Sequence, residues 1–235
     1  MCFSPQTSFV AATLLMVIGV ATLKKVKTRK EVLFASLPFL FAMQQFTEGF
    51  LWLSLLHGEF PTEQHWLTIV FISFAGIVLP LLVPLSMFVM EINAHRKIII
   101  GIFFLSGLAI ALITFKAITD FGVSSEIINS CIRYDSPLNR SYYVTLLYVM
   151  ATCGPLLYSR HRNIFRIGIL NLGALLIAYY FYKYSYASVW CFFASSISAL
   201  VYLHFARSSE AKPAVLRANS WRKLSFKKLI NINYR

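Results

Sequence analysis

Residues 41–53, FAMQQFTEGFLWL, place two amides and a carboxylate inside an apolar run. Gln45, Glu48 and Trp52 recur at three- and four-residue spacing, with Gln44 one turn before Glu48, so a helix carries them on one face. An acidic side chain at the centre of a membrane helix costs about 2.5 to 3.5 kcal/mol, so Glu48 must be neutral, paired or wetted. We interpret this face as a functional site, with helix packing as the alternative.

The composition of the whole chain predicts that this run lies in a membrane. Hydrophobic residues make up 58% of the 235 residues and charged residues 13%, whereas soluble domains are nearer about half and a quarter. Apolar segments of about 20 residues, the length that crosses a bilayer, divide the sequence. They number seven and cover about residues 5–23, 32–56, 65–90, 98–119, 141–158, 164–182 and 186–206. We therefore expect an all-α fold, an integral membrane bundle of seven transmembrane helices.

The placement of the basic residues predicts the orientation of these helices. Lysine and arginine raise the formal net charge to +13 and gather in residues 24–30, 96–97, 160–166 and 207–235. These regions share one side of the bundle, which the positive-inside rule assigns to the cytoplasm. The N-terminus is then outside and the C-terminus inside. The chain divides into a transmembrane domain, residues 1–206, and a basic cytoplasmic tail, residues 207–235.

The tail indicates which partners to expect. Its basic residues alternate with apolar ones that do not gather on one helical face, which favours a polybasic strip on anionic lipid headgroups, at about 1 kcal/mol per basic residue. A disordered tail is the alternative, and nucleic acid is not an expected partner of so short a segment. The expected partners are therefore the lipid bilayer, anionic headgroups and an unknown small ligand.

Polar or small residues also form stripes on the fifth and seventh segments, where the spacing again gives one helical face. Such stripes usually let helices pack closely, and a ligand pocket is the alternative. Lys116 is the one basic residue well inside a segment. We expect Glu48 to face the bundle interior within reach of a glutamine, of Lys116 or of a hydroxyl group on the fifth or seventh segment. The candidate ligand-binding residues are Gln44, Gln45, Glu48, Trp52, Lys116, Tyr148, Thr152, Ser188, Trp190 and Ser195.

The sequence lacks the motifs of the common enzyme classes, including HExxH, GxSxG, the Walker phosphate loop and GxGxxG. His57, Glu63 and His65 flank one short outer loop, where solvated loop residues are a better interpretation than a metal site. We therefore expect no metal, no cofactor and no catalytic residue, and the sequence favours a function other than an enzyme.

Cysteine placement predicts a disulfide. Under this topology Cys2, Cys131 and Cys191 lie toward the oxidising side, while Cys153 lies in the inner half of its segment. The long outer loop that carries Cys131 needs an anchor, and Cys191 offers one on a rigid helix. We expect a Cys131–Cys191 disulfide first and Cys2–Cys131 second. Free buried thiols and a three-thiolate metal site are the alternatives.

Three stretches, MCFS at 1–4, EGFLWL at 48–53 and SVWCFFA at 188–194, resemble an uncharacterised bacterial family of small polytopic membrane proteins that begin Met-Cys-Phe-Ser. The resemblance covers nearly the whole chain. It implies a protein of the bacterial inner membrane, and it carries no established activity to this sequence. It directs attention to Cys2, Glu48, Trp52, Trp190 and Cys191.

Three functions stay open. The first is a multi-pass membrane protein whose polar site around Glu48 binds or transports a small solute, a cation or a proton, although no inverted repeat supports a carrier. The second is an intramembrane enzyme on a lipid-like substrate, with Glu48 as acid or base and a serine or cysteine of the seventh segment nearby. The third is a scaffold or sensor whose polar residues only specify packing.

Overall fold

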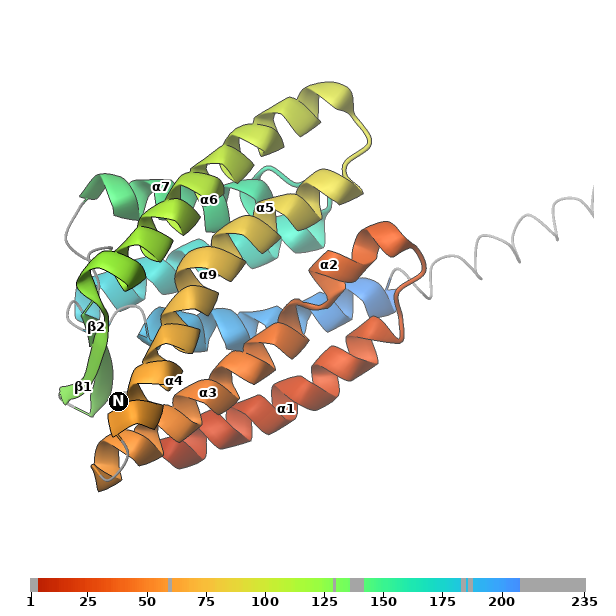
Figure 1. Cartoon of the computed structure of the whole chain (residues 1–235). Coiled ribbons are helices and arrows are strands. Elements are labelled where there is room, and N and C mark those ends of the chain that lie inside the picture. Colours follow the sequence, from red (N-terminus) through yellow and green to blue (C-terminus); the bar gives the residue numbers. More distant parts are fainter. Residues whose placement is uncertain are drawn as a thin grey trace, which may run out of the picture.

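The computed structural model describes residues 4–58, 61–128, 130–135, 142–182, 185 and 188–207, and within them the chain is mostly helical. Five helices are long and apolar enough to cross a membrane (Figure 1). They are α1 (Pro5–Leu23), the continuous helix Pro61–Met90, α6 (Ala94–Phe121), α9 (Arg162–Phe181) and the helix Ser188–Arg207. Five of the seven expected segments thus reach the length and hydropathy of a membrane span.

The two remaining segments are helical but fall short of those limits. α3 (Leu37–His57) follows the short α2 (Val32–Ala35), and its buried amides and carboxylate lower its hydropathy. α7 (Tyr142–Thr152) is apolar but short, and α8 (Gly154–Leu157) continues it after a break of one residue. Pro155 accounts for the break, because it has no backbone N–H to continue the helical ladder.

The helix Pro61–Met90 changes its winding in the middle. α4 (Pro61–Ser73) passes into the π-helical turn η2 (Phe74–Val78) and then into α5 (Leu79–Met90). Pro80 accounts for the wider turn, because its nitrogen cannot donate and its ring clashes with the carbonyl group four residues earlier.

Hydroxyl groups of neighbouring helices donate hydrogen bonds to the carbonyl oxygens that this π turn leaves without a helical partner. Tyr148 donates to the oxygen of Ala75 at 2.9 Å, and Thr114 Oγ1 donates to that of Gly76 at 3.2 Å. The turn therefore fixes both α6 and α7. α6 runs beside α5 (Figure 1), and Gly107 passes so close to the Pro80 oxygen that a Cβ atom there would overlap it.

A β-hairpin lies at one end of the bundle (Figure 1), and it corrects the all-α expectation. β1 (Ser124–Ile128) pairs antiparallel with β2 (Cys131–Asp135), with Ser125 opposite Tyr134. Ser130, in the turn, has a left-handed backbone with φ 58°. The strand signal was the alternation of apolar and polar residues from Ile132 to Asp135, just after an Asn-Ser pair, which the search for helix-length segments passed over.

The hairpin docks on α4 through polar and aromatic contacts. Ser125 Oγ lies 2.7 Å from Thr68 Oγ1, and the Ser125 carbonyl accepts from Gln64 Nε2 at 3.1 Å. On β2, Tyr134 stacks on Phe71 with ring centroids 4.2 Å apart and planes 4° apart. Because Tyr134 is 3% exposed, this docking turns its side chain into the bundle.

Basic residues mark the opposite end, which we call the basic end, in contrast to the hairpin end. The loop after α1 leads through Lys24, Lys25 and Lys27 to the short helix η1 (Arg29–Glu31). Figure 1 shows this loop at the end away from the hairpin, together with the α5–α6 loop, which Arg96 follows in the first turn of α6. Of the tail 207–235, Arg207 alone belongs to the described residues.

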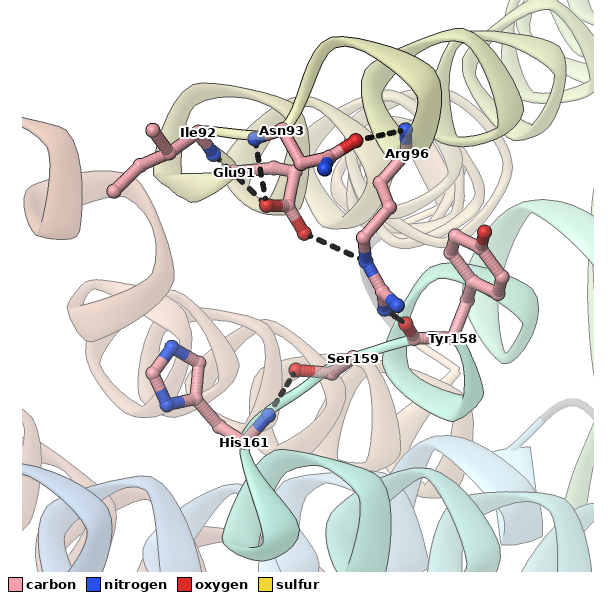
Figure 2. A network of polar contacts seen from close by, with 7 residues as sticks. All are labelled: Glu91, Ile92, Asn93, Arg96, Tyr158, Ser159 and His161. Carbon is pink, nitrogen blue, oxygen red and sulfur yellow. Dashed lines mark hydrogen bonds and ion pairs between the residues drawn. The ribbon is translucent and has the colours of Figure 1, made fainter.

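A network of polar contacts joins two loops at the basic end (Figure 2). The Glu91 carboxylate accepts from the backbone N–H groups of Ile92 and Asn93, at 2.9 and 3.0 Å, and from Arg96 Nε at 3.0 Å. Arg96 Nη2 donates to the carbonyl of Tyr158, and the guanidinium carbon lies 4.3 Å from the Tyr158 ring centroid. The α5–α6 loop is thereby fixed to the end of α8.

This network makes the fold sensitive to acid. Partial burial alone raises the pKa of Glu91, but the N–H groups of Asn93 and Ile92 and the Arg96 guanidinium outweigh it, so the pKa lies below its usual value. Because the folded pKa is the lower one, the carboxylate stabilises the fold above the pKa of the unfolded chain. That stabilisation is lost as the pH falls through the folded pKa.

We predict that E91Q lowers the free energy of unfolding at pH 7 by about 1–2 kcal/mol, since Arg96 loses a charged partner. The difference from the unsubstituted chain should shrink below about pH 4. Thermal unfolding in detergent micelles at pH 7, 5 and 3.5 measures both effects. The matched control is E126Q, which breaks the exposed ion pair with Arg133 and should change little. A difference that is independent of pH would contradict the role of the Glu91 charge.

The close approach of α5 and α6 gives a second prediction. G107A should destabilise the fold by about 1–3 kcal/mol, because the added methyl group forces α6 away from the Pro80 carbonyl. G101A, on the same helix, adds a methyl group with nothing within 4 Å and should be neutral or stabilising. Thermal unfolding of the two variants in one detergent compares them, and equal midpoints would contradict the contact.

Candidate functional site

The polar face of α3 points into the bundle. Gln44, Gln45, Glu48 and Trp52 are each at most 5% exposed, although α3 also presents outward-facing residues such as Phe50, which is 53% exposed. The amides and the carboxylate therefore lie on the side of α3 that packs against the rest of the protein, as the spacing predicted.

Three elements supply partners to the Glu48 carboxyl group. Gln45 Nε2, one turn away on α3, donates to Glu48 Oε2 at 3.2 Å. Ser188 Oγ, from the last described helix, donates to Glu48 Oε1 at 2.5 Å. The phenol of Tyr134, from β2, lies near the same carboxyl group and interacts with it electrostatically. We call Gln44, Gln45, Glu48, Tyr134 and Ser188 the Glu48 cluster.

No cation of the described chain neutralises this carboxyl group. The two ion pairs among those residues, Arg96–Glu91 and Arg133–Glu126, lie elsewhere. Lys116, expected to reach inward, is exposed on the outer surface of α6, so that expectation was wrong. A long flexible lysine side chain keeps its charge in a polar environment more cheaply than in the core. Without a cation, the buried carboxyl group is held most favourably in its neutral form.

Gln44 differs from the other members of the cluster, because neither its Nε2 nor its Oε1 atom has a hydrogen-bond partner. The same holds for Oε1 of Gln45. Gln44 is 2% exposed, and the free thiol of Cys191 lies close to its amide. Buried amide atoms without partners cost about 1–3 kcal/mol each, so they point to a missing molecule, a water or a ligand.

The other ligand-binding candidates bond to the backbone. Tyr148 is held by Ala75, as described above, and also packs edge-on against Trp190, with centroids 5.3 Å apart. Thr152 Oγ1 donates to the Tyr148 carbonyl, and Ser195 Oγ donates to that of Phe192. Trp190 Nε1 donates to the carbonyl of Asn171 at 3.4 Å. These contacts join or bend helices, and they leave the Glu48 cluster as the candidate site.

An internal cavity of about 40 Å³ lies next to these helices, between α3, α5, α9 and the helix Ser188–Arg207. Most of its lining is apolar, with Thr152, Asn171 and Ser198 as the polar exceptions. A cavity needs about 10–15 Å³ to hold a water, but apolar cavities stay dry. Neither Glu48 nor Gln44 lines it, so we treat it as a packing defect apart from the cluster.

Sequence reasoning missed two of the residues that matter here. Tyr134 belongs to the hairpin that the helical interpretation passed over, so no depth in the membrane was assigned to it. Asn171, 7% exposed, donates from Nδ2 to Cys153 Sγ at 3.4 Å. Its signal was available, since it interrupts the apolar run from Ile167 to Leu176.

The expected Cys131–Cys191 disulfide is wrong. Cys191 and Cys153 are free and buried, whereas Cys131, at the start of β2, is disulfide-bonded. The hairpin fold explains the difference, because β2 brings Cys131 to the end of the bundle while Cys191 faces Gln44 inside it. Cys2, the partner in the second expectation, lies outside the described residues.

The comparisons with known proteins give a family without a function. The model of a family described as "Family of unknown function (DUF6629)" matches residues 1–217. No curated protein and no solved structure matches the chain. The family match agrees with the resemblance to an uncharacterised family, and the site has to be interpreted from its own geometry.

The cysteine assignment predicts a labelling pattern. In denaturant without reductant, a maleimide should label Cys153 and Cys191 and leave Cys131 unlabelled. The second expectation, Cys2–Cys131, stays a prediction, and a cross-linked peptide of this pair in non-reducing mass spectrometry would test it. Reduction before labelling should raise the count to four thiols. Labelling of Cys131 without reductant would contradict the disulfide.

Proposed function

Because the chain belongs to this family of unknown function, we propose its role from the Glu48 cluster: a multi-pass membrane protein that binds a small polar or cationic ligand, a proton included, inside the bundle. The observation that carries the proposal is the buried Gln44 amide, which has the Cys191 thiol beside it but makes no hydrogen bond of good geometry, and which lies one turn from a carboxyl group without a cation.

The chemistry of the cluster limits the ligand. An amide offers both a donor and an acceptor, and a carboxyl group accepts when ionised and donates when protonated. A small amine or ammonium ion could place its N–H groups on Glu48 and on the free amide oxygens. A proton on Glu48 is the smallest ligand that removes its charge. Larger solutes do not fit unless neighbouring side chains move, since every cluster residue is buried.

The proposed setting is a membrane crossed seven times, with α3 and the α7–α8 pair added to the five helices above. The bilayer is then the main partner, and the basic end faces the cytoplasm with the N-terminus outside, as the positive-inside rule requires. The tail would meet anionic headgroups there. The resemblance to a bacterial family favours the inner membrane of a bacterium.

The Ser188–Glu48 hydrogen bond favours a second candidate, an intramembrane enzyme on lipid esters. Glu48 would take the proton of Ser188 as Oγ attacks the ester carbonyl carbon, and would return it to the departing alcohol. Water would then cleave the acyl-serine and release the fatty acid. Gln45 orients the carboxylate, and the free Nε2 of Gln44 is a donor for the developing oxyanion. This reaction needs an ionised Glu48, whereas proton binding ends with a neutral one.

A pair of substitutions tests whether Gln44 serves a ligand. Q44L removes two unpartnered atoms at similar volume, so the empty protein should gain about 1–2 kcal/mol in unfolding free energy. The same variant should lose ligand binding, which is the trade-off expected of a functional residue. Q45L is the matched control, because its Nε2 holds Glu48 and its loss should destabilise the fold. Thermal unfolding in detergent measures both, and destabilisation by Q44L would contradict the free amide.

Binding itself is tested with small probes. In proteoliposomes, the unsubstituted protein should bind methylammonium and should support an acid-driven proton flux. E48Q should lower the methylammonium affinity and the proton flux about tenfold or more, since a charge-assisted hydrogen bond is worth about 1.5–3 kcal/mol. A fluorophosphonate that labels Ser188, and not the S188A variant, would instead establish the enzyme. Normal flux by E48Q, together with no labelling, would leave the cluster a packing device and end both candidates.

A further inference from the structure

A groove runs along the outside of the bundle between α1 and the helix Ser188–Arg207, with a volume of about 480 Å³. Val10, Leu14 and Ile18 form its α1 wall at four-residue spacing, and Phe192, Ser196 and Ala199 belong to its opposite wall. No residue of the Glu48 cluster lines it, and the proposed ligand-binding role does not use it.

The groove exists because α1 packs against α3 instead of the last helix. A Cβ on Gly19 would lie 2.6 Å from the Phe39 nitrogen, and one on Gly49 would lie 2.9 Å from the Phe9 ring. The backbones of α1 and α3 therefore pack closely against each other. On the side of the groove, by contrast, the facing residues Ala11, Ser196 and Ala199 are small and do not fill the gap.

The shape and polarity of the groove match one chain of a lipid. Gln6, exposed, and Thr7 form its polar rim, and the α1 residues below them are apolar down to Ile18. The twelve helical steps from Gln6 to Ile18 span about 18 Å, and one leaflet of the hydrocarbon core is roughly 15 Å thick. The groove is therefore as deep as one leaflet, with its polar rim at the hairpin end of α1.

We propose that this groove binds one acyl chain of a phospholipid in the leaflet at the hairpin end, with the ester and headgroup at the Gln6–Thr7 rim. The bilayer supplies this occupant, since both walls belong to helices long and apolar enough to cross it. A convex helix surface is covered by exchanging lipids, whereas a concave channel between two helices holds a chain on both sides and retains it longer.

The groove also leads toward the Glu48 cluster. Ser188, which donates to Glu48, lies four residues before Phe192, so it is one turn from the groove wall on nearly the same helical face. A lipid seated here therefore packs against the helix that carries Ser188, one turn along from it. If the enzyme candidate of the proposed function holds, its substrate class is a phospholipid ester. The groove itself does not depend on that candidate.

The experiment uses the full chain in nanodiscs that contain a phospholipid with a diazirine in its acyl chain. Illumination followed by peptide mapping should place most cross-links on α1 and on the helix Ser188–Arg207. A11W and A199W fill the groove and should reduce these cross-links several-fold. V17W is the matched control, because Val17 lies on α1, off the groove, and is 67% exposed.

Three outcomes are distinguishable. Retained labelling in V17W and its loss in A11W and A199W, with equal thermal midpoints, establishes the groove. Equal labelling of α6 around Leu105, which is 62% exposed, together with no effect of A11W, means ordinary surrounding lipid only and overturns it. Labelling is repeated on E48Q, where persisting cross-links would show that the lipid groove does not depend on the Glu48 site. Conversely, an A11W variant that loses the cross-links but still binds methylammonium normally would show that the Glu48 site does not depend on the groove.

Discussion

The Glu48 carboxyl group has to be satisfied inside a bundle that places no cation of the described chain beside it. Removing a charge from water without a partner costs several kcal/mol, so the fold supplies hydrogen-bonding groups instead. They come from α3 itself and from the helix Ser188–Arg207, and Tyr134 of β2 lies beside the same carboxyl group, although the three elements are far apart in the sequence. The cluster thus joins three elements, and the hairpin is a structural partner of the buried helix rather than an external loop.

The same requirement applies to the backbone, and it separates structural polar residues from available ones. The π turn at Pro80 releases carbonyl oxygens inside the bundle, and Tyr148 and Thr114 satisfy them. Thr152 and Ser195 bond to carbonyls of their own helices, as hydroxyl groups in membrane helices commonly do. Once these bonds are assigned, Gln44 stands out because neither atom of its amide has a partner.

Local signals predicted the fold where the determining residues are close in sequence. α1 has the expected bounds, and the Thr7 N–H bonds to the Ser4 side chain that caps it. The burial of the α3 polar face followed from its periodicity. Helical spacing predicted which residues share a face of one helix. It could not select the partner of Glu48 from another helix, because tertiary packing places Ser188 beside Glu48 and leaves Lys116 exposed. Similarly, spacing could not tell Gln44 from Gln45, since the difference lies in one hydrogen bond.

The two ends of the bundle differ in the kind of contact that closes them. At the basic end, Arg96 joins the α5–α6 loop to α8 through a charged hydrogen bond and a ring contact (Figure 2). At the hairpin end, a two-stranded sheet covers the cluster, and its polar docking contacts above are neutral hydrogen bonds to α4. Isolated hairpins are marginal in water, and neutral bonds are about half as strong as charged ones. The hairpin end is therefore held by neutral hydrogen bonds together with the Tyr134–Phe71 ring stack and the disulfide at Cys131, and Tyr134 links this closure to the Glu48 cluster.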